Sequence, residues 1–135
     1  MDDVGPDNTP ERQIEAVRML VAEIPGADRV LAEHLADNEA VLPYVLINDL
    51  ARFYGRAFED GDDRVVRATA GALEPMSAST DEDVSGLVVE FLQTLASRCV
   101  GGRTREIAAV AALRAATGPV TAERLDNAVR LFGLT

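Results

Sequence analysis

Apolar side chains recur at intervals of three and four residues along nearly the whole chain after residue 8. This spacing places them on one face of a helix, and no stretch alternates apolar and polar residues as a half-buried strand does. The first helix is expected to start at the N-cap residue Thr9, followed by Pro10, and to stop at Pro25-Gly26. Its predicted inward face consists of Ile14, Val17, Leu20, Val21 and Ile24.

Two further helices are predicted before residue 60. A short one runs from Ala27 to about Ala36, with Val30, Leu31 and Leu35 facing inward. A longer one begins at Pro43 and carries a wide apolar stripe, which indicates a central helix buried on much of its circumference. The residues on that stripe are Leu46, Ile47, Leu50, Phe53, Tyr54, Ala57 and Phe58.

The next two helices have predicted caps. Asp62 is expected to be the N-cap of a helix whose inward residues are Val65, Val66, Thr69, Leu73 and Met76. The segment Ser79-Thr80-Asp81-Glu82 matches a capping box, with Ser79 as N-cap and Glu82 three residues later. The helix that follows keeps its apolar period without a break, through Val84, Leu87, Val88, Phe91, Leu92 and Leu95.

The carboxyl-terminal part predicts two more helices. Gly101-Gly102 precedes an Ala-rich helix with Ile107, Val110 and Leu113 inward, and Thr121 is the expected N-cap of the last one. The inward residues of that last helix are Leu125, Ala128, Val129 and Phe132. The sequence therefore predicts an all-α protein with a flexible acidic tail over residues 1–8 and one helical domain over residues 9–135. We expect a bundle or short stack of about six to seven antiparallel helices.

Composition agrees with a folded chain in water. Of its 135 residues, 47% are hydrophobic and 27% are charged, which is far from the composition of disordered chains. The amino terminus has neither the basic start nor the apolar stretch of a secretory signal, and no apolar segment approaches the ~20 residues that cross a bilayer. We therefore expect a cytoplasmic protein that does not associate with membranes.

Charge is distributed unevenly along the chain. The formal net charge is −10, and residues 1–63 hold 15 acidic and 5 basic residues, whereas residues 101–135 hold 3 acidic and 5 basic ones. Such a field repels nucleic acid and would steer a cationic partner towards the amino-terminal half. Solubility alone accounts for the same charge, so both interpretations stay open.

The strongest polar cluster is His34 with Asp37, Asn38 and Glu39, at the end of the short second helix. These side chains could converge on one point, but His34 is the only histidine, and transition metals normally take more nitrogen or sulfur ligands. A histidine at a helix carboxyl end is also expected from the helix dipole. We predict no metal, no cofactor and no catalytic group there.

Three other features are candidates for a chemical role. Asp49 borders the most apolar stripe, and Arg52, one turn away, offers it an ion pair, so a structural role is favoured over proton transfer. Cys99 follows Arg98, which would lower the pKa of the thiol, but no catalytic base is evident beside it. Gly101-Gly102-Arg103-Thr104 lacks the Lys and the preceding strand of a phosphate-binding loop.

Several segments together carry a family resemblance. They are Asp37-Asn38-Glu39 with Leu42-Pro43, the run from Leu46 to Phe53, the run from Val84 to Leu95, and Gly118-Pro119. With this arrangement the chain resembles a family of small all-helical bacterial proteins of unknown function, some of which look like immunity proteins of polymorphic toxin systems. The resemblance implies an interaction module and supplies no catalytic residues.

The sequence therefore favours a non-enzymatic protein that binds another protein, as an acidic immunity or antitoxin factor masking a basic surface. The alternative is a small-molecule binder or enzyme with a pocket between helices, near Asp49 or near His34 and Glu39. A homodimer formed through the Ala-rich sixth helix is a third interpretation. No nucleic-acid partner is expected.

Overall fold

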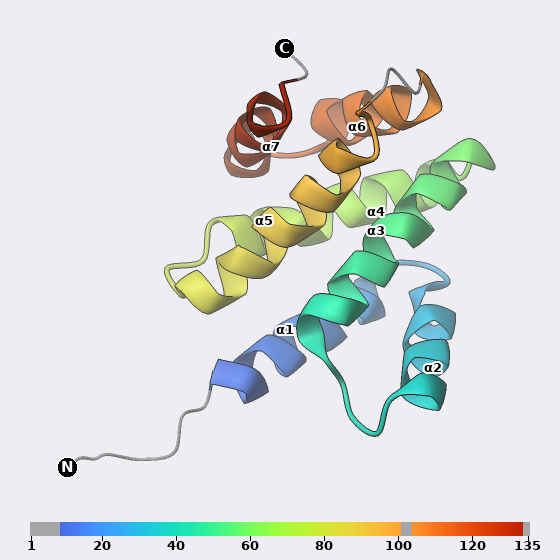
Figure 1. Cartoon of the computed structure of the whole chain (residues 1–135), viewed down its shortest axis with the longest axis vertical. Coiled ribbons are helices and arrows are strands. Elements are labelled where there is room, and N and C mark those ends of the chain that lie inside the picture. Colours follow the sequence, from blue (N-terminus) through green and yellow to red (C-terminus); the bar gives the residue numbers. More distant parts are fainter. Residues whose placement is uncertain (1–8, 101–103, 134–135) are drawn as a thin grey trace.

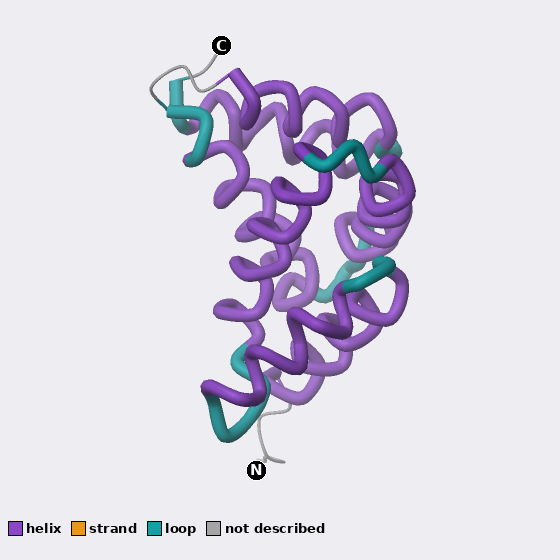
Figure 2. Tube along the Cα trace, turned by 90° about the vertical axis from the view of Figure 1, so that its right-hand side faces the viewer, coloured by secondary structure: helices purple, strands orange, loops and turns teal. Residues whose placement is uncertain are grey.

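Helices form wherever the apolar period predicts them. The computed structural model describes residues 9–100 and 104–133, and within these ranges the chain forms seven α-helices and no strand (Figures 1 and 2). The all-α prediction is therefore confirmed, whereas the predicted tail over residues 1–8 and Gly101-Gly102 lie outside the described residues. The helices are α1 (Thr9–Glu23), α2 (Ala27–Asp37), α3 (Pro43–Glu59), α4 (Asp63–Ser77), α5 (Glu82–Ser97), α6 (Thr104–Ala116) and α7 (Pro119–Leu131).

Three helices, α3, α4 and α5, connect the two ends of the molecule. Helices α1 and α2 lie at one end of its long axis, and α6 and α7 lie at the other (Figure 1). The most extensive contact joins α3 to α5, and α5 to α7 and α4 to α6 follow. The largest contacts therefore join helices that are two apart in the sequence, rather than consecutive hairpins.

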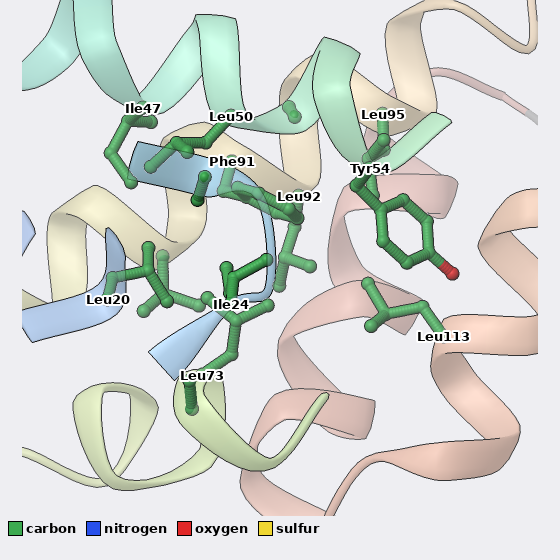
Figure 3. Packing of buried hydrophobic residues seen from close by; sticks show 14 of the residues in the cluster. Leu20, Ile24, Ile47, Leu50, Tyr54, Leu73, Phe91, Leu92, Leu95 and Leu113 are labelled. Atoms are coloured by element: carbon green, nitrogen blue, oxygen red, sulfur yellow. The ribbon is translucent and has the colours of Figure 1, made fainter. Parts of the chain in front are cut away.

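The core lies between α3, α5 and the helices around them. Its largest fully buried side chains include Tyr54, Phe91, Leu20, Leu50 and Leu73 (Figure 3). The rings of Tyr54 and Phe91 meet edge to face, with centroids 6.3 Å apart. Burying each such side chain contributes about 2 kcal/mol to the free energy of folding. This packing holds α3 against α5.

Tyr54 also supplies a polar link inside the core. Its hydroxyl donates a 2.7 Å hydrogen bond to the carbonyl of Ala109 on α6. Burial raises the pKa of Tyr54 far above its usual value, so the phenol stays a donor. The inward face of α6 was predicted correctly at Leu113, which is buried, and wrongly at Ile107. Ile107 is 47% exposed, because α6 turns the small Ala109 towards the core instead.

Helix starts follow the predicted caps only in part. The Asp62 carboxylate accepts the Val65 N–H at 3.2 Å, so this N-cap is confirmed. The capping box is wrong, because α5 begins at Glu82 and its N-cap is Asp81, whose carboxylate accepts the Asp83 N–H at 3.0 Å. The Ser79 hydroxyl accepts the Asp81 N–H at 3.1 Å, so it bonds to the N-cap residue and not to the helix.

The start of α7 is capped from another helix. Thr121, predicted as the N-cap, is the third helical residue, and its hydroxyl lies 2.7 Å from that of Ser77. The Glu74 carboxylate on α4 accepts the N–H groups of Val120 at 3.1 Å and of Thr121 at 2.9 Å. Glu74 thus satisfies two donors that the first turn of a helix leaves open.

The absence of a side chain at Gly118 makes room for the Glu74 cap. A Cβ atom at Gly118 would lie 2.5 Å from the Cδ atom of Glu74, so only glycine lets the carboxylate reach α7. Partial burial raises the pKa of Glu74, but the hydrogen bonds from Thr121 and Val120 outweigh it and leave that pKa below its usual value near 4.5. The ionised carboxylate is therefore the form that the fold prefers.

We predict that Glu74→Ala lowers the free energy of unfolding by about 1 kcal/mol at pH 7, the usual worth of a helix cap. A lowered folded-state pKa means that this contribution is complete above pH 4.5 and disappears as the pH falls further. Urea unfolding at pH 7 and at about pH 3 should therefore show a difference from the wild type that shrinks in acid.

Gly118→Ala provides the matched test, because it displaces the carboxylate without removing it. The double variant should cost less than the sum of the two single changes, since both remove the same cap. Additive costs would contradict a shared cap.

Candidate functional site

Most of the candidate polar residues meet in one place. Helices α2 and α3 enclose an open hollow of about 440 Å³. Five of the six candidates line it, and Glu39 is exposed on the loop outside it. The five are His34, Asp37, Asn38, Asp49 and Arg52.

His34 is the buried anchor of this region. Its side chain is fully buried, and its Nε2 atom accepts a 3.0 Å hydrogen bond from the backbone N–H of Leu42. Asn38, at the carboxyl end of α2, donates from Nδ2 to the carbonyl of His34 at 2.9 Å. Two bonds therefore hold the turn between α2 and α3, which follows the lower edge of the molecule in Figure 1.

These bonds also determine the form of the imidazole. A backbone N–H can only donate, so Nε2 of His34 must be the acceptor, and the proton of the neutral ring lies on Nδ1. Nδ1 faces the Asp49 carboxylate, with 3.9 Å between Nδ1 and Oδ2. The histidine thus links the loop on one side to an acid of α3 on the other.

Asp49 has the partner that the sequence predicts. Its Oδ1 atom accepts a 3.0 Å hydrogen bond from Arg52, one turn along α3. Both side chains are substantially exposed, at 38% for Asp49 and 49% for Arg52, so the ion pair itself contributes little to stability. The geometry fits the structural interpretation of Asp49.

Convergence of His34, Asp37 and Glu39 on one ion does not occur. Within the described ranges, no three His, Cys, Asp or Glu side chains are placed to hold a metal together. Nε2 of His34, the atom best suited to a metal, is engaged by Leu42. The bond to Leu42 thus gives His34 a structural role.

The inward face of α2 was predicted correctly at Val30 and wrongly at Leu35. Leu35, predicted to be buried, is 40% exposed, and His34 takes the inward position beside Ala27 and Val30. A signal was present, because His34 follows Val30 by four residues and Ala27 by seven, which is one helical face. A polar residue on that face was not recognised as part of the core.

Four large apolar side chains are exposed on and beside the turn that His34 anchors, and the sequence pattern did not predict them as a group. Leu35 follows His34, Leu42 is bonded to it through its backbone, and Tyr44 and Val45 lie in the first turn of α3. Their exposed fractions are between 40% and 45%. We call these four residues, Leu35, Leu42, Tyr44 and Val45, the α2–α3 patch.

Cys99 does not have a lowered pKa. It is 2% exposed, and its thiol lies 3.5 Å from the carbonyl of Leu95. Burial raises the pKa of the thiol, the charge of Glu106 raises it further, and Arg98 offsets only part of this. The expectation of a lowered pKa from Arg98 is therefore wrong, because desolvation outweighs one arginine.

Comparison with protein-family models, with curated proteins and with solved structures finds no match to this chain. None of the helices in the described ranges is both long enough and apolar enough to span a bilayer.

We predict that His34→Leu lowers the free energy of unfolding by about 1 kcal/mol, because it removes the acceptor of the Leu42 N–H and with it a bond that holds the turn. His34→Gln is the matched variant, since its side-chain oxygen can take the place of Nε2. Urea unfolding gives the stability, and hydrogen exchange of the Leu42 amide reports on the bond. Equal losses in both variants, with unchanged exchange at Leu42, would contradict the anchoring role.

Proposed function

We propose that this chain is a non-enzymatic protein-binding module that recognises a basic partner through the α2–α3 patch. One observation carries the proposal. Four half-exposed apolar side chains lie on and beside the turn that a fully buried histidine fixes. Apolar groups that are already held in place on the surface lose little conformational entropy when a partner binds. Exposed groups of this kind are typical of interaction sites.

The charges around the patch indicate what kind of partner fits. Residues 30–51 contain four acids, at positions 33, 37, 39 and 49, and they outnumber the two arginines of the adjacent hollow, Arg52 and Arg56. A surface with exposed apolar groups among acids complements a surface with apolar groups among Arg and Lys. The unequal distribution of charge along the chain supports the same partner chemistry.

Because the chain resembles immunity proteins, we propose that the partner is a toxin. The acidic patch would then cover the basic surface through which that toxin acts. A toxin gene beside the gene for this chain would support that proposal. A neighbourhood without one would contradict the immunity role and leave protein binding to be tested separately.

The binding test is a pull-down with tagged protein from the source cells. Val45→Asn should reduce the recovered partner about tenfold, because it removes apolar contact from the patch. Ile107→Asn is the matched control, since Ile107 is equally exposed, lies in the first turns of α6 and is remote from the patch. Both variants should unfold within about 0.5 kcal/mol of the wild type.

Charge is tested in the same assay. Asp37→Arg should weaken recovery more than Asp60→Arg, an equal charge change at the far end of α3, and raising the salt concentration should weaken it further. Recovery that is independent of both salt and Val45 would contradict the proposed surface.

A small polar ligand in the hollow between α2 and α3 is the second candidate function. The volume of about 440 Å³ lies in the usual range for ligand sites, and Arg52, Arg56 and Asp49 supply charges of both signs. Protein binding is preferred because His34, Asn38 and Asp49 are already bonded within the fold. A thermal-shift screen tests the alternative, since a ligand of the folded form raises the melting temperature.

A further inference from the structure

A second surface feature shares no residue with the α2–α3 patch. A groove of about 370 Å³ runs between α1 and the corner where α4 passes into α5. Helix α1 contributes the side chains between positions 12 and 23, about 16 Å of helix at 1.5 Å per residue. This length is three turns, enough to hold one short helix.

The floor of the groove is apolar. Small side chains meet where α1 faces α4, with Ala16 on one side and Ala72 and Pro75 on the other, so the two helices leave a trough between them. Leu20 and Val84 form part of its base. The remaining apolar members are the flexible Met76, partly buried, and Met19, which is 62% exposed. Methionine adapts its shape to different partners.

The rims of the groove are acidic. Glu15, Glu23 and Asp81 lie along it, and the one cation there, Arg12, is bonded to Asp81 at 2.8 Å and to Asp83 at 3.0 Å. Arg12 keeps the pKa of Asp81 below its usual value, so that carboxylate is ionised at neutral pH. The four ionisable residues of the lining, one basic and three acidic, therefore carry a net charge of −2.

Two of these acids form no ion pair in the described part of the chain. The side chains of Glu15 and Glu23 take part there in neither an ion pair nor a hydrogen bond. Glu23 is also the last residue of α1, whose final turn holds no basic residue. A carboxylate at the negative end of a helix dipole is unfavourable, so the isolated fold gains nothing from it there.

We propose that this groove binds a basic amphipathic helix of a partner protein. The apolar face of such a helix would lie on the alanines and methionines, and its Lys or Arg side chains would pair with Glu15 and Glu23. Binding of this kind uses apolar anchors at helical spacing. The site is separate from the α2–α3 patch, so each can fail without the other.

Other occupants fit less well. A second copy of the chain carries a net charge of −10, so the acidic rims repel it as a whole, although its residues 101–135 are mildly basic. Anionic lipid is repelled for the same reason. Charge complementarity therefore selects a cationic helix.

The test uses synthetic 18-residue peptides and the methionine methyl groups as reporters. Two of the three methionines, Met19 and Met76, line the groove, so methyl NMR of ¹³C-methionine protein observes it directly. A Lys–Leu peptide with leucines at helical spacing should shift both signals. A Glu–Leu peptide with the same spacing and a scrambled Lys–Leu peptide should not.

Variants locate the binding. Glu23→Arg should weaken the Lys–Leu peptide about tenfold, whereas Glu123→Arg, an equal change at an exposed site on α7, should leave it within about twofold. Met19→Gln should weaken it about threefold, and Leu131→Gln, 66% exposed on α7, should not. Because Glu23 opposes the helix dipole, Glu23→Arg should also raise the thermal midpoint, which shows that the variant is folded.

Several outcomes would overturn the proposal. They are the absence of Met19 and Met76 shifts at 100-fold peptide excess, equal affinity in the Glu23 and Glu123 variants, and binding of the scrambled or acidic peptide. Shifts that depend on protein concentration alone would assign the groove to a second copy, and shifts with phosphatidylglycerol vesicles would assign it to lipid.

Discussion

The packing of α3 against α5 is the constraint on which the rest of the structure depends. These two helices share the most extensive contact, and its centre is the fully buried pair Tyr54 and Phe91. Helix α2 contacts only α1 and α3, so its position follows from that of α3. The α2–α3 patch is therefore held indirectly by the core, through a helix whose inner face is apolar and whose first turn is exposed.

A few polar contacts fix the starts and positions of helices, which apolar packing alone does not determine. Apolar contacts are not directional, so they bring helices together without fixing where each one begins. His34 fixes the entry into α3, Glu74 fixes the entry into α7, and Tyr54 ties α6 to the centre. In each case a side chain from one helix satisfies a backbone group of another segment. These contacts give a core of largely interchangeable aliphatic side chains its specific geometry.

The sequence predicts the helices well because each one carries its own apolar period. The start of α3 at Pro43 and the cap at Asp62 involve neighbours in sequence and were predicted correctly. The cap of α7 was not, because Glu74 lies 44 residues before Gly118 and only tertiary structure brings them together. Thr121 is a reasonable cap by local rules, but its hydroxyl is engaged with Ser77.

In the candidate site, too, features that depend on sequence neighbours were easier to predict than features that depend on contacts between helices. Proximity in sequence was enough to select His34, Asp37, Asn38, Asp49 and Arg52, which do meet around one hollow. The chemistry was less predictable, because the burial of His34 depends on which face of α2 packs against α1 and α3. The groove beside α1 was missed because it arises between helices. One signal was present in the sequence, because Met19 lies off the apolar stripe of its helix. That position indicates an exposed side chain beside α1.

The two tyrosines are the only strongly ultraviolet-absorbing side chains, because the chain contains no Trp. Tyr54 is enclosed and hydrogen-bonded at the centre, whereas Tyr44 stands at the surface of the α2–α3 patch with its hydroxyl close to Gly86. The intrinsic absorbance and emission of the protein thus come from one chromophore sealed in the interior and one open to quenchers. Selective replacement of either by phenylalanine would leave a label-free optical probe of the other environment.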